Sequence, residues 1–171
     1  MTNAPPFPRE IETDPCVTAL REVLAAASRP LWRDATTTVP TVRLDDQLAS
    51  VLGRAGRGGM LVLGLEAATA ALAREAHGLV AADARGAGPR PSRISRLLLL
   101  ADDGAERFYR AADTLMRRHG TRLLTCRLDA PSAQLGNAVL GRPVGVKAVL
   151  VQHKQVVAGV LRALAGVVDE G

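Results

Sequence analysis

The sequence predicts an α/β fold, a three-layer αβα sandwich around a four-stranded mixed sheet, with an N-terminal helical extension. Of its 171 residues, 47% are hydrophobic and 23% charged, which is enough apolar side chain for one buried core. From residue 44 onward, short apolar runs bounded by glycine or polar residues alternate with stretches of helical periodicity. The resulting order, α-β-α-β-α-β-α-β-α, is typical of a mixed or parallel sheet covered by helices.

The N-terminal extension is predicted to hold one helix. Residues 1–13 contain three prolines and no apolar periodicity, which is typical of a mobile tail. Asp14 and Pro15 then predict a helix start, as an N-cap followed by a proline in the first turn. The apolar face of this helix is made of Val17, Leu20 and Leu24, and the helix ends before Pro30.

A change of composition near residue 43 marks the predicted domain boundary. Residues 32–42 contain three consecutive threonines and a proline, and they predict a linker with room for a short edge strand. We therefore assign residues 1–43 to a tail, helix and linker, and residues 44–171 to the αβα domain.

The αβα domain begins with an apolar stripe at helical spacing. The stripe consists of Leu44, Leu48, Val51, Leu52 and Ala55, and it ends at the glycine-rich segment 56–59. A long loop is predicted over residues 83–95, which contain two glycines and two prolines. The other predicted elements are a strand at 60–63, a helix at 66–76, a strand at 97–100, a helix at 105–119, a strand at 123–128, a helix at 129–140, a strand at 146–151 and a helix at 153–168.

Composition excludes several classes of protein. Only four aromatic residues occur, too few for base-stacking platforms or a membrane-interface belt. The longest apolar run, residues 156–168, is interrupted by Arg162 and is much shorter than a membrane span. The N-terminus has no secretory pattern, and two cysteines without close spacing predict free thiols. We therefore expect a cytoplasmic protein without a membrane partner.

Positive charge is concentrated beyond residue 50. The net charge of the chain is +5, yet residues 1–50 carry five basic and seven acidic side chains. Nearly all the basic residues are arginine, whose planar guanidinium donates paired hydrogen bonds to phosphate. A GC-rich genome also enriches arginine and alanine, so the charge alone leaves both explanations open.

Few residues suggest catalysis. Asp102 and Asp103 follow a predicted strand, where carboxylates can bind Mg²⁺, but we favour a cap on the helix that starts near residue 105. The three histidines lie in different elements and show no metal-ligand spacing. The glycines of 53–59 follow a helix and precede a strand, the reverse of a dinucleotide-binding turn. We expect no enzyme activity, no metal and no cofactor, with a small magnesium enzyme as a minor alternative.

Four pieces of residues 44–168 together carry a resemblance to a known family. They are a helix, an arginine-alanine-glycine turn and a strand at 48–64, a strand with an acidic end at 96–103, a basic helix end at 117–120, and a glycine-bounded helix at 134–142 before the strand 146–151. In this order the pieces look like the opening helix and successive strands of the kink-turn RNA-binding ribosomal-protein family (the L-seven-Ae and L-thirty-e group). Residues 44–168 resemble in particular the small bacterial ribosome-associated members of that family.

The resemblance implies non-catalytic binding of structured RNA. In the family, RNA meets the start of the second helix and the loop after the fourth, which correspond here to residues 64–70 and 141–145. Glu66, Ala67 and Ala70 stand where archaeal and eukaryotic members have Asn, Glu and Lys. Alanine can neither read a base pair nor neutralise a phosphate, so binding is expected to depend on arginine and phosphate.

These arguments lead to one functional prediction and one alternative. We predict a bacterial RNA-binding, ribosome-associated protein whose partner is structured RNA, above all rRNA. Arginines of the long segment 73–96 could add non-specific phosphate attraction, or the segment could be a tolerated insertion. The alternative is a protein-interaction module that kept the fold and lost RNA, favoured by Glu66 and the acidic first 50 residues. The predicted RNA-binding residues are Arg54, Arg57, Gly64, Glu66, Thr69, Arg142 and Lys147.

Overall fold

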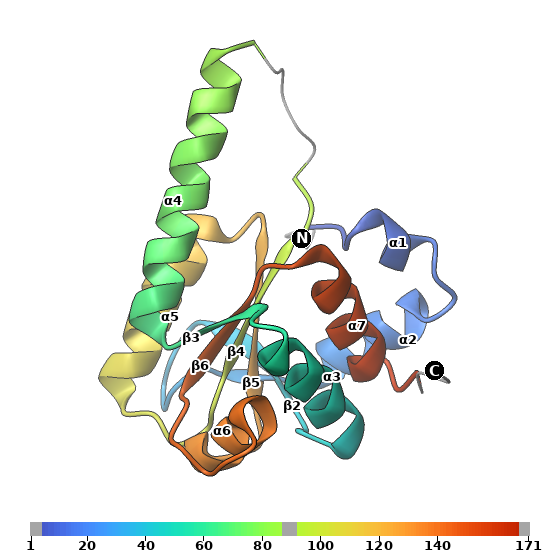
Figure 1. Ribbon diagram of the computed structural model, residues 1–171, viewed down its shortest axis with the longest axis vertical. Helices are drawn as coiled ribbons and strands as arrows, with labels where there is room; N and C mark the ends of the chain where they lie inside the picture. Colours follow the sequence, from blue (N-terminus) through green and yellow to red (C-terminus); the bar gives the residue numbers. More distant parts are fainter. Residues whose placement is uncertain (1–4, 87–91, 168–171) are drawn as a thin grey trace.

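A mixed β-sheet between two layers of helices forms the protein (Figure 1). The structure is a computed structural model, and it describes residues 5–86 and 92–167. Its helices are α1 (Arg9–Glu12), α2 (Val17–Ala26), α3 (Asp46–Arg57), α4 (Leu65–Ala84), α5 (Glu106–His119), α6 (Ser132–Leu140) and α7 (Lys154–Leu164). Its strands are β1 (Ser28–Pro30), β2 (Thr38–Val42), β3 (Leu61–Leu63), β4 (Arg96–Leu100), β5 (Leu123–Leu128) and β6 (Ala148–Val151).

The sheet has the strand order β1-β2-β5-β4-β6-β3. Strands β2, β5 and β4 are parallel, whereas β6 is antiparallel to both β4 and β3, and β1 is antiparallel to β2. The α/β class and the mixed sheet are confirmed, but the prediction of four strands is wrong, because the described residues form six. The two additional strands, β1 and β2, come from the N-terminal extension.

Each face of the sheet carries its own hydrophobic core. Helices α1, α2, α3, α6 and α7 cover one face, and α4 and α5 cover the other. Strand β4 shows why the sequence predicts a buried strand here: Leu97 and Leu99 enter the first core, and Leu98 and Leu100 the second. Alternate side chains point to opposite faces, so a strand covered on both sides is apolar at every position.

The N-terminal extension packs on the same core as the rest of the chain. Ile11 of α1 and Leu20 of α2 are fully buried, and Phe7 lies beside them. Arg162 of α7 donates from Nε to Asp14 Oδ2 at 3.0 Å, which ties the extension to the last helix. The prediction of a mobile tail is therefore wrong for residues 5–13; residues 1–4 lie outside the described part of the chain. The boundary after residue 43 stays a prediction.

Helix α4 is much longer than the predicted helix 66–76. It runs to Ala84, so it includes the start of the predicted loop 83–95, and residues 87–91 of that loop are not described. The alanine-rich sequence after Leu72 explains the extension, because alanine favours helix without any packing. The buried residues of α4 end at Leu72, and its second half projects away from the sheet (Figure 1).

Candidate nucleic-acid interface

Three chain segments carry the predicted RNA-binding residues. They are the last turn of α3, the turn between β3 and α4, and the loop between α6 and β6. Strand β3 pairs with β6, and the backbone N–H of Gly64 donates to the carbonyl of Ala148 at 2.8 Å. We call Arg54, Arg57, Gly64, Glu66, Thr69, Arg142 and Lys147 the candidate interface. Their role in binding stays a prediction.

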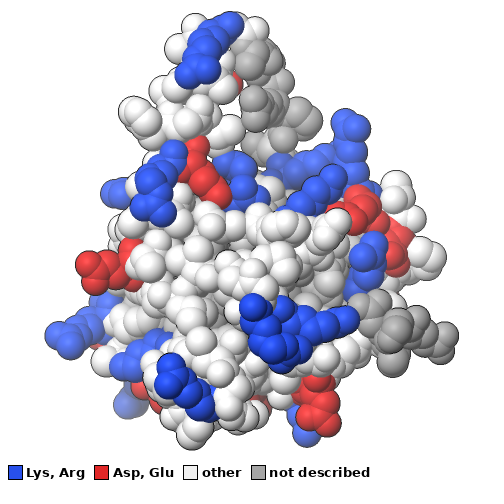
Figure 2. All heavy atoms as spheres, viewed as in Figure 1, with Lys and Arg blue, Asp and Glu red and all other residues white. Residues whose placement is uncertain are grey.

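Helix α3 positions Arg54 and Arg57. The Asp45 carboxylate caps its N-terminus by accepting from the backbone N–H of Leu48 at 2.9 Å. Both arginines lie in the last turn and are exposed, where a cation is favoured by the helix dipole. The helix continues to Arg57, so it includes the first two residues of the glycine-rich segment 56–59, where the sequence predicts its end. Figure 2 shows basic side chains gathered over α3, and a second group lower in the view near α6.

Glycines allow α3 and α6 to pack with their backbones in contact. A Cβ atom on Gly56 would lie 2.1 Å from the carbonyl oxygen of Val139, and one on Gly53 would lie 3.1 Å from that of Ala138. The Arg57 Nη1 atom is 3.4 Å from the same Cβ position of Gly53, so its side chain folds back along α3 beside α6. This close packing fixes the arginines of α3 relative to the end of α6.

The loop after α6 is held against that helix. Gly141 ends α6 in the left-handed conformation, with φ of 73°. The backbone N–H of Val146 donates to the carbonyl of Ser132 at 3.0 Å, which returns the chain to the start of the helix. Arg142 and Lys147 are exposed at the two ends of this loop. Their positions are therefore set by backbone contacts although their side chains reach solvent.

The N-terminus of α4 forms the third part of the candidate interface. Gly64 precedes it with φ of 95°, which glycine adopts without strain, and no side chain caps the helix. The first backbone N–H groups of a helix attract anions. Glu66 is exposed in the first turn and competes with such an anion, and the Thr69 hydroxyl donates to the carbonyl of Leu65 at 2.7 Å. Thr69 can thus offer RNA only an acceptor.

Asp103 joins the loop region to the start of α6. Its carboxylate accepts from the Ser132 backbone N–H at 3.0 Å and from the Ser132 hydroxyl at 2.8 Å. Partial burial acts to raise the pKa of this carboxyl, but the Ser132 hydrogen bonds and the Lys147 charge outweigh it, so the pKa lies below its ordinary value. The expected cap on α5 is wrong: no side chain of its N-cap residue caps α5, and Asp103 instead accepts from Ser132, the first residue of α6.

Sequence reasoning missed the residues that hold the candidate interface together. Gly56 and Gly136 carry no chemistry of their own, yet a Cβ on Gly136 would lie 1.6 Å from the carbonyl oxygen of Val144. The only signal in the sequence is a pair of glycines inside helical periodicity, and such glycines often mark a close approach of backbone. Their role is to position Arg54, Arg57 and Arg142.

Both cysteines are shielded from solvent. Cys16 and Cys126 are both free and buried, and full burial raises the pKa of the Cys126 thiol to about 12. Within residues 5–86 and 92–167, no cluster of histidine, cysteine and carboxylate side chains could hold a metal ion. No helix in the same ranges is long and apolar enough to cross a bilayer.

Comparison with known proteins assigns no family. No protein-family model matches the sequence, and no curated protein matches it significantly. One similar solved structure is a protein of unknown function from Bacillus halodurans, which is 20% identical, with a TM-score of 0.44. The match covers 71% of this chain and 99% of that one.

Proposed function

We propose that the protein binds structured RNA without catalysis, with rRNA as the foremost partner, and that arginine–phosphate contacts supply most of the affinity. The proposal rests on one observation: α3 packs against α6 with their backbones in contact at Gly53 and Gly56. The last turn of α3, which carries Arg54 and Arg57, therefore lies beside the end of α6 that Arg142 follows, although 88 residues separate Arg54 from Arg142 in the sequence.

The chemistry of the candidate interface suits a folded phosphate backbone better than a base edge. Arginine donates in pairs to phosphate oxygens, and the uncapped start of α4 adds backbone donors. The residues at 67 and 70 are alanines, which have no polar atom in the side chain. Recognition would therefore depend on the shape of the RNA, since phosphate contacts carry no base information.

The salt dependence of RNA binding tests this proposal. Affinity for a kink-turn RNA and for a plain duplex of equal length would be measured between 50 and 200 mM salt, for wild type and for Arg54→Ala/Arg57→Ala. We expect a preference for the kink-turn. We also expect weaker salt dependence in the double variant: the magnitude of the slope of log affinity against log salt should fall by roughly 1.4–1.8, the contribution of two phosphate contacts.

Arg33→Ala/Arg107→Ala is the matched control. It removes the same charge from exposed positions near α5, which covers the opposite face of the sheet from α3. We expect its salt slope to equal that of wild type. An equal reduction of the salt slope in both double variants would show that only net charge matters, and would contradict a specific interface.

Glu66→Gln is expected to strengthen RNA binding by roughly threefold at low salt, an effect that added salt removes. Glu66 places a negative charge in the first turn of α4, beside the proposed phosphate position. Glu22→Gln, an exposed carboxylate on α2, is the control and should leave affinity unchanged. Weaker binding by Glu66→Gln would instead show that the carboxylate accepts hydrogen bonds from the RNA.

A protein-interaction module is the second candidate, and α4 favours it. The half of α4 beyond Leu72 contributes no buried side chain within the described chain, and Val80 on it is 68% exposed. A projecting alanine-rich helix is a plausible docking element for another protein. Weak and equal binding of both RNAs, lost by 200 mM salt, would favour this candidate over RNA recognition.

A further inference from the structure

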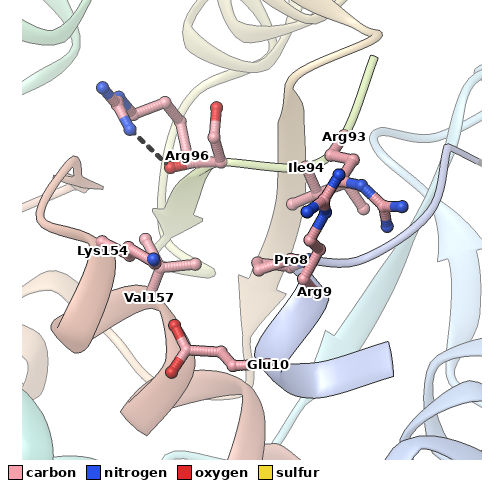
Figure 3. Close-up of a pocket in the computed structure, with 9 residues that line it drawn as sticks. Pro8, Arg9, Glu10, Arg93, Ile94, Arg96, Lys154 and Val157 are labelled. Carbon is pink, nitrogen blue, oxygen red and sulfur yellow. Dashed lines mark hydrogen bonds between the residues drawn. The ribbon is translucent and has the colours of Figure 1, made fainter. Parts of the chain in front are cut away.

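A pocket of about 340 Å³ lies at the opposite end of the sheet from Lys147 and Gly64. It is formed where α1, the segment that leads into β4, and the first turn of α7 meet (Figure 3). Its volume is at the lower end of the range for pockets that bind small molecules. The N-terminal extension therefore completes a cavity that the αβα domain alone would leave open.

The walls of the pocket combine apolar surface with positive charge. Pro8, Ile94 and Val157 supply the apolar part, and Ile94 and Val157 belong to the hydrophobic core. Figure 3 shows Arg9 and Arg93 on one side of the pocket and Lys154 on the other. The only carboxylate among the lining residues is that of Glu10.

The fourth cation of the lining, Arg96, is engaged elsewhere. Its Nε donates to both carboxylate oxygens of Glu75, at 2.9 and 3.0 Å, and its Nη1 donates to the carbonyl of Ser95 at 2.7 Å. Figure 3 shows its guanidinium turned away from the space between Lys154 and Arg93. The charge available to a ligand thus comes from Arg9, Arg93 and Lys154.

Polar atoms in the pocket wall are buried without a hydrogen-bond partner. They are the Nε of Arg93, the hydroxyl oxygen of Ser95 and one carboxylate oxygen of Glu10. The other Glu10 oxygen lies 4.0 Å from Arg162, whose closer partner is Asp14. A buried polar atom without a partner is costly, so most such atoms in folded proteins are satisfied. Here a ligand oxygen can accept from Arg93 and Ser95, and a ligand hydroxyl or N–H can donate to Glu10.

We propose that this pocket binds a small organic anion. Its carboxylate or phosphate group lies among Arg9, Arg93 and Lys154, and its apolar body packs on Pro8, Ile94 and Val157. The start of α7 adds to the attraction, because no side chain caps that helix and its first N–H groups lie beside Lys154. The inference is independent of RNA binding, because the pocket shares no lining residue with the candidate interface.

Titration with four probes tests the proposal on the full chain. Phenyl phosphate and benzoate carry both an anion and a ring, inorganic phosphate carries only the anion, and benzyl alcohol only the ring. Binding would be followed by calorimetry and by the amide NMR shifts of Ile94, Ser95 and Val157. We expect at least one of the two ring anions to bind about tenfold more tightly than either single-feature probe. The tighter of the two identifies the head group.

Lys154→Gln is expected to lower the affinity for the ring anion roughly tenfold, the effect of one charged hydrogen bond. Lys147→Gln is the matched control, since these are the only lysines in the chain and lie at opposite ends of the sheet. Arg93→Gln should act like Lys154→Gln, but Arg93 also donates to the carbonyl of Phe7 at 3.2 Å, so its folding is checked separately. Absence of ring-anion binding up to roughly 5 mM, or equal affinity in wild type and Lys154→Gln, would overturn the proposal.

Discussion

Gly56→Ala is expected to lower the free energy of unfolding by about 3 kcal/mol, the upper part of the usual range for overpacking. The added Cβ would lie 2.1 Å from the carbonyl oxygen of Val139 and 3.1 Å from its carbonyl carbon. Both atoms belong to the backbone of α6, so no side chain can rotate to relieve the contact. The two helices must separate, and the Arg54 and Arg57 side chains move with α3.

Gly78→Ala is the matched control for Gly56→Ala. Gly78 lies inside α4, and a Cβ there would meet no atom within 4 Å. Alanine is the better helix former, so this variant should gain roughly 0.5–1 kcal/mol. Urea denaturation followed by circular dichroism measures the stability of both variants. The slope of unfolding free energy against urea concentration shows whether the unfolded state has changed. A Gly56→Ala variant as stable as wild type would show that α3 and α6 do not pack as closely as described.

Leu20→Ala is expected to destabilise the whole protein by about 2–4 kcal/mol, as large-to-small changes in a core do. Leu20 is fully buried on α2 and belongs to the same core as α3, α6 and α7. Because the extension also adds β2 to the sheet, its loss of packing should shift a single unfolding transition rather than create a second one.

Val23→Ala on the same helix serves as the control for Leu20→Ala. Val23 is 38% exposed, so its truncation should change stability by roughly 0.5 kcal/mol or less. Circular dichroism would follow unfolding of the whole chain, and the fluorescence of Trp32 would follow unfolding of residues 1–43. Two separate transitions in Leu20→Ala, or no shift at all, would show that residues 1–43 fold as an independent unit.

The sequence predicts those parts of the fold whose local pattern agrees with their surroundings. The four leucines of β4 indicate a buried strand because both sheet faces are covered, and the periodicity of α5 survives in the structure. Strand β1 could not be predicted, since Ser28, Arg29 and Pro30 are all exposed and are ordered only by pairing with β2. Tertiary pairing thus creates a strand where local preference is weak.

The candidate site could be predicted only as a set of residues. Arginines and glycines in order along the chain indicate phosphate contacts, but their proximity depends on the α3–α6 packing and on the Gly64–Ala148 hydrogen bond. Asp103 shows the limit most clearly. Its position before α5 suggests a local cap, whereas its actual partner, Ser132, lies 29 residues away. Long-range hydrogen bonds of this kind leave no local pattern in sequence.

The position of β6 between β4 and β3 has a consequence for biosynthesis. Strand β6 is the last strand of the described chain to leave the ribosome, yet β3 and β4 both pair with it and not with each other. Until residue 151 emerges, β3 has no neighbour and β4 has an open edge. A nascent chain that stalls earlier exposes apolar edges that invite association with other chains. Completion of the sheet is therefore a late event in synthesis, and truncation before β6 should yield an aggregating fragment rather than a smaller domain.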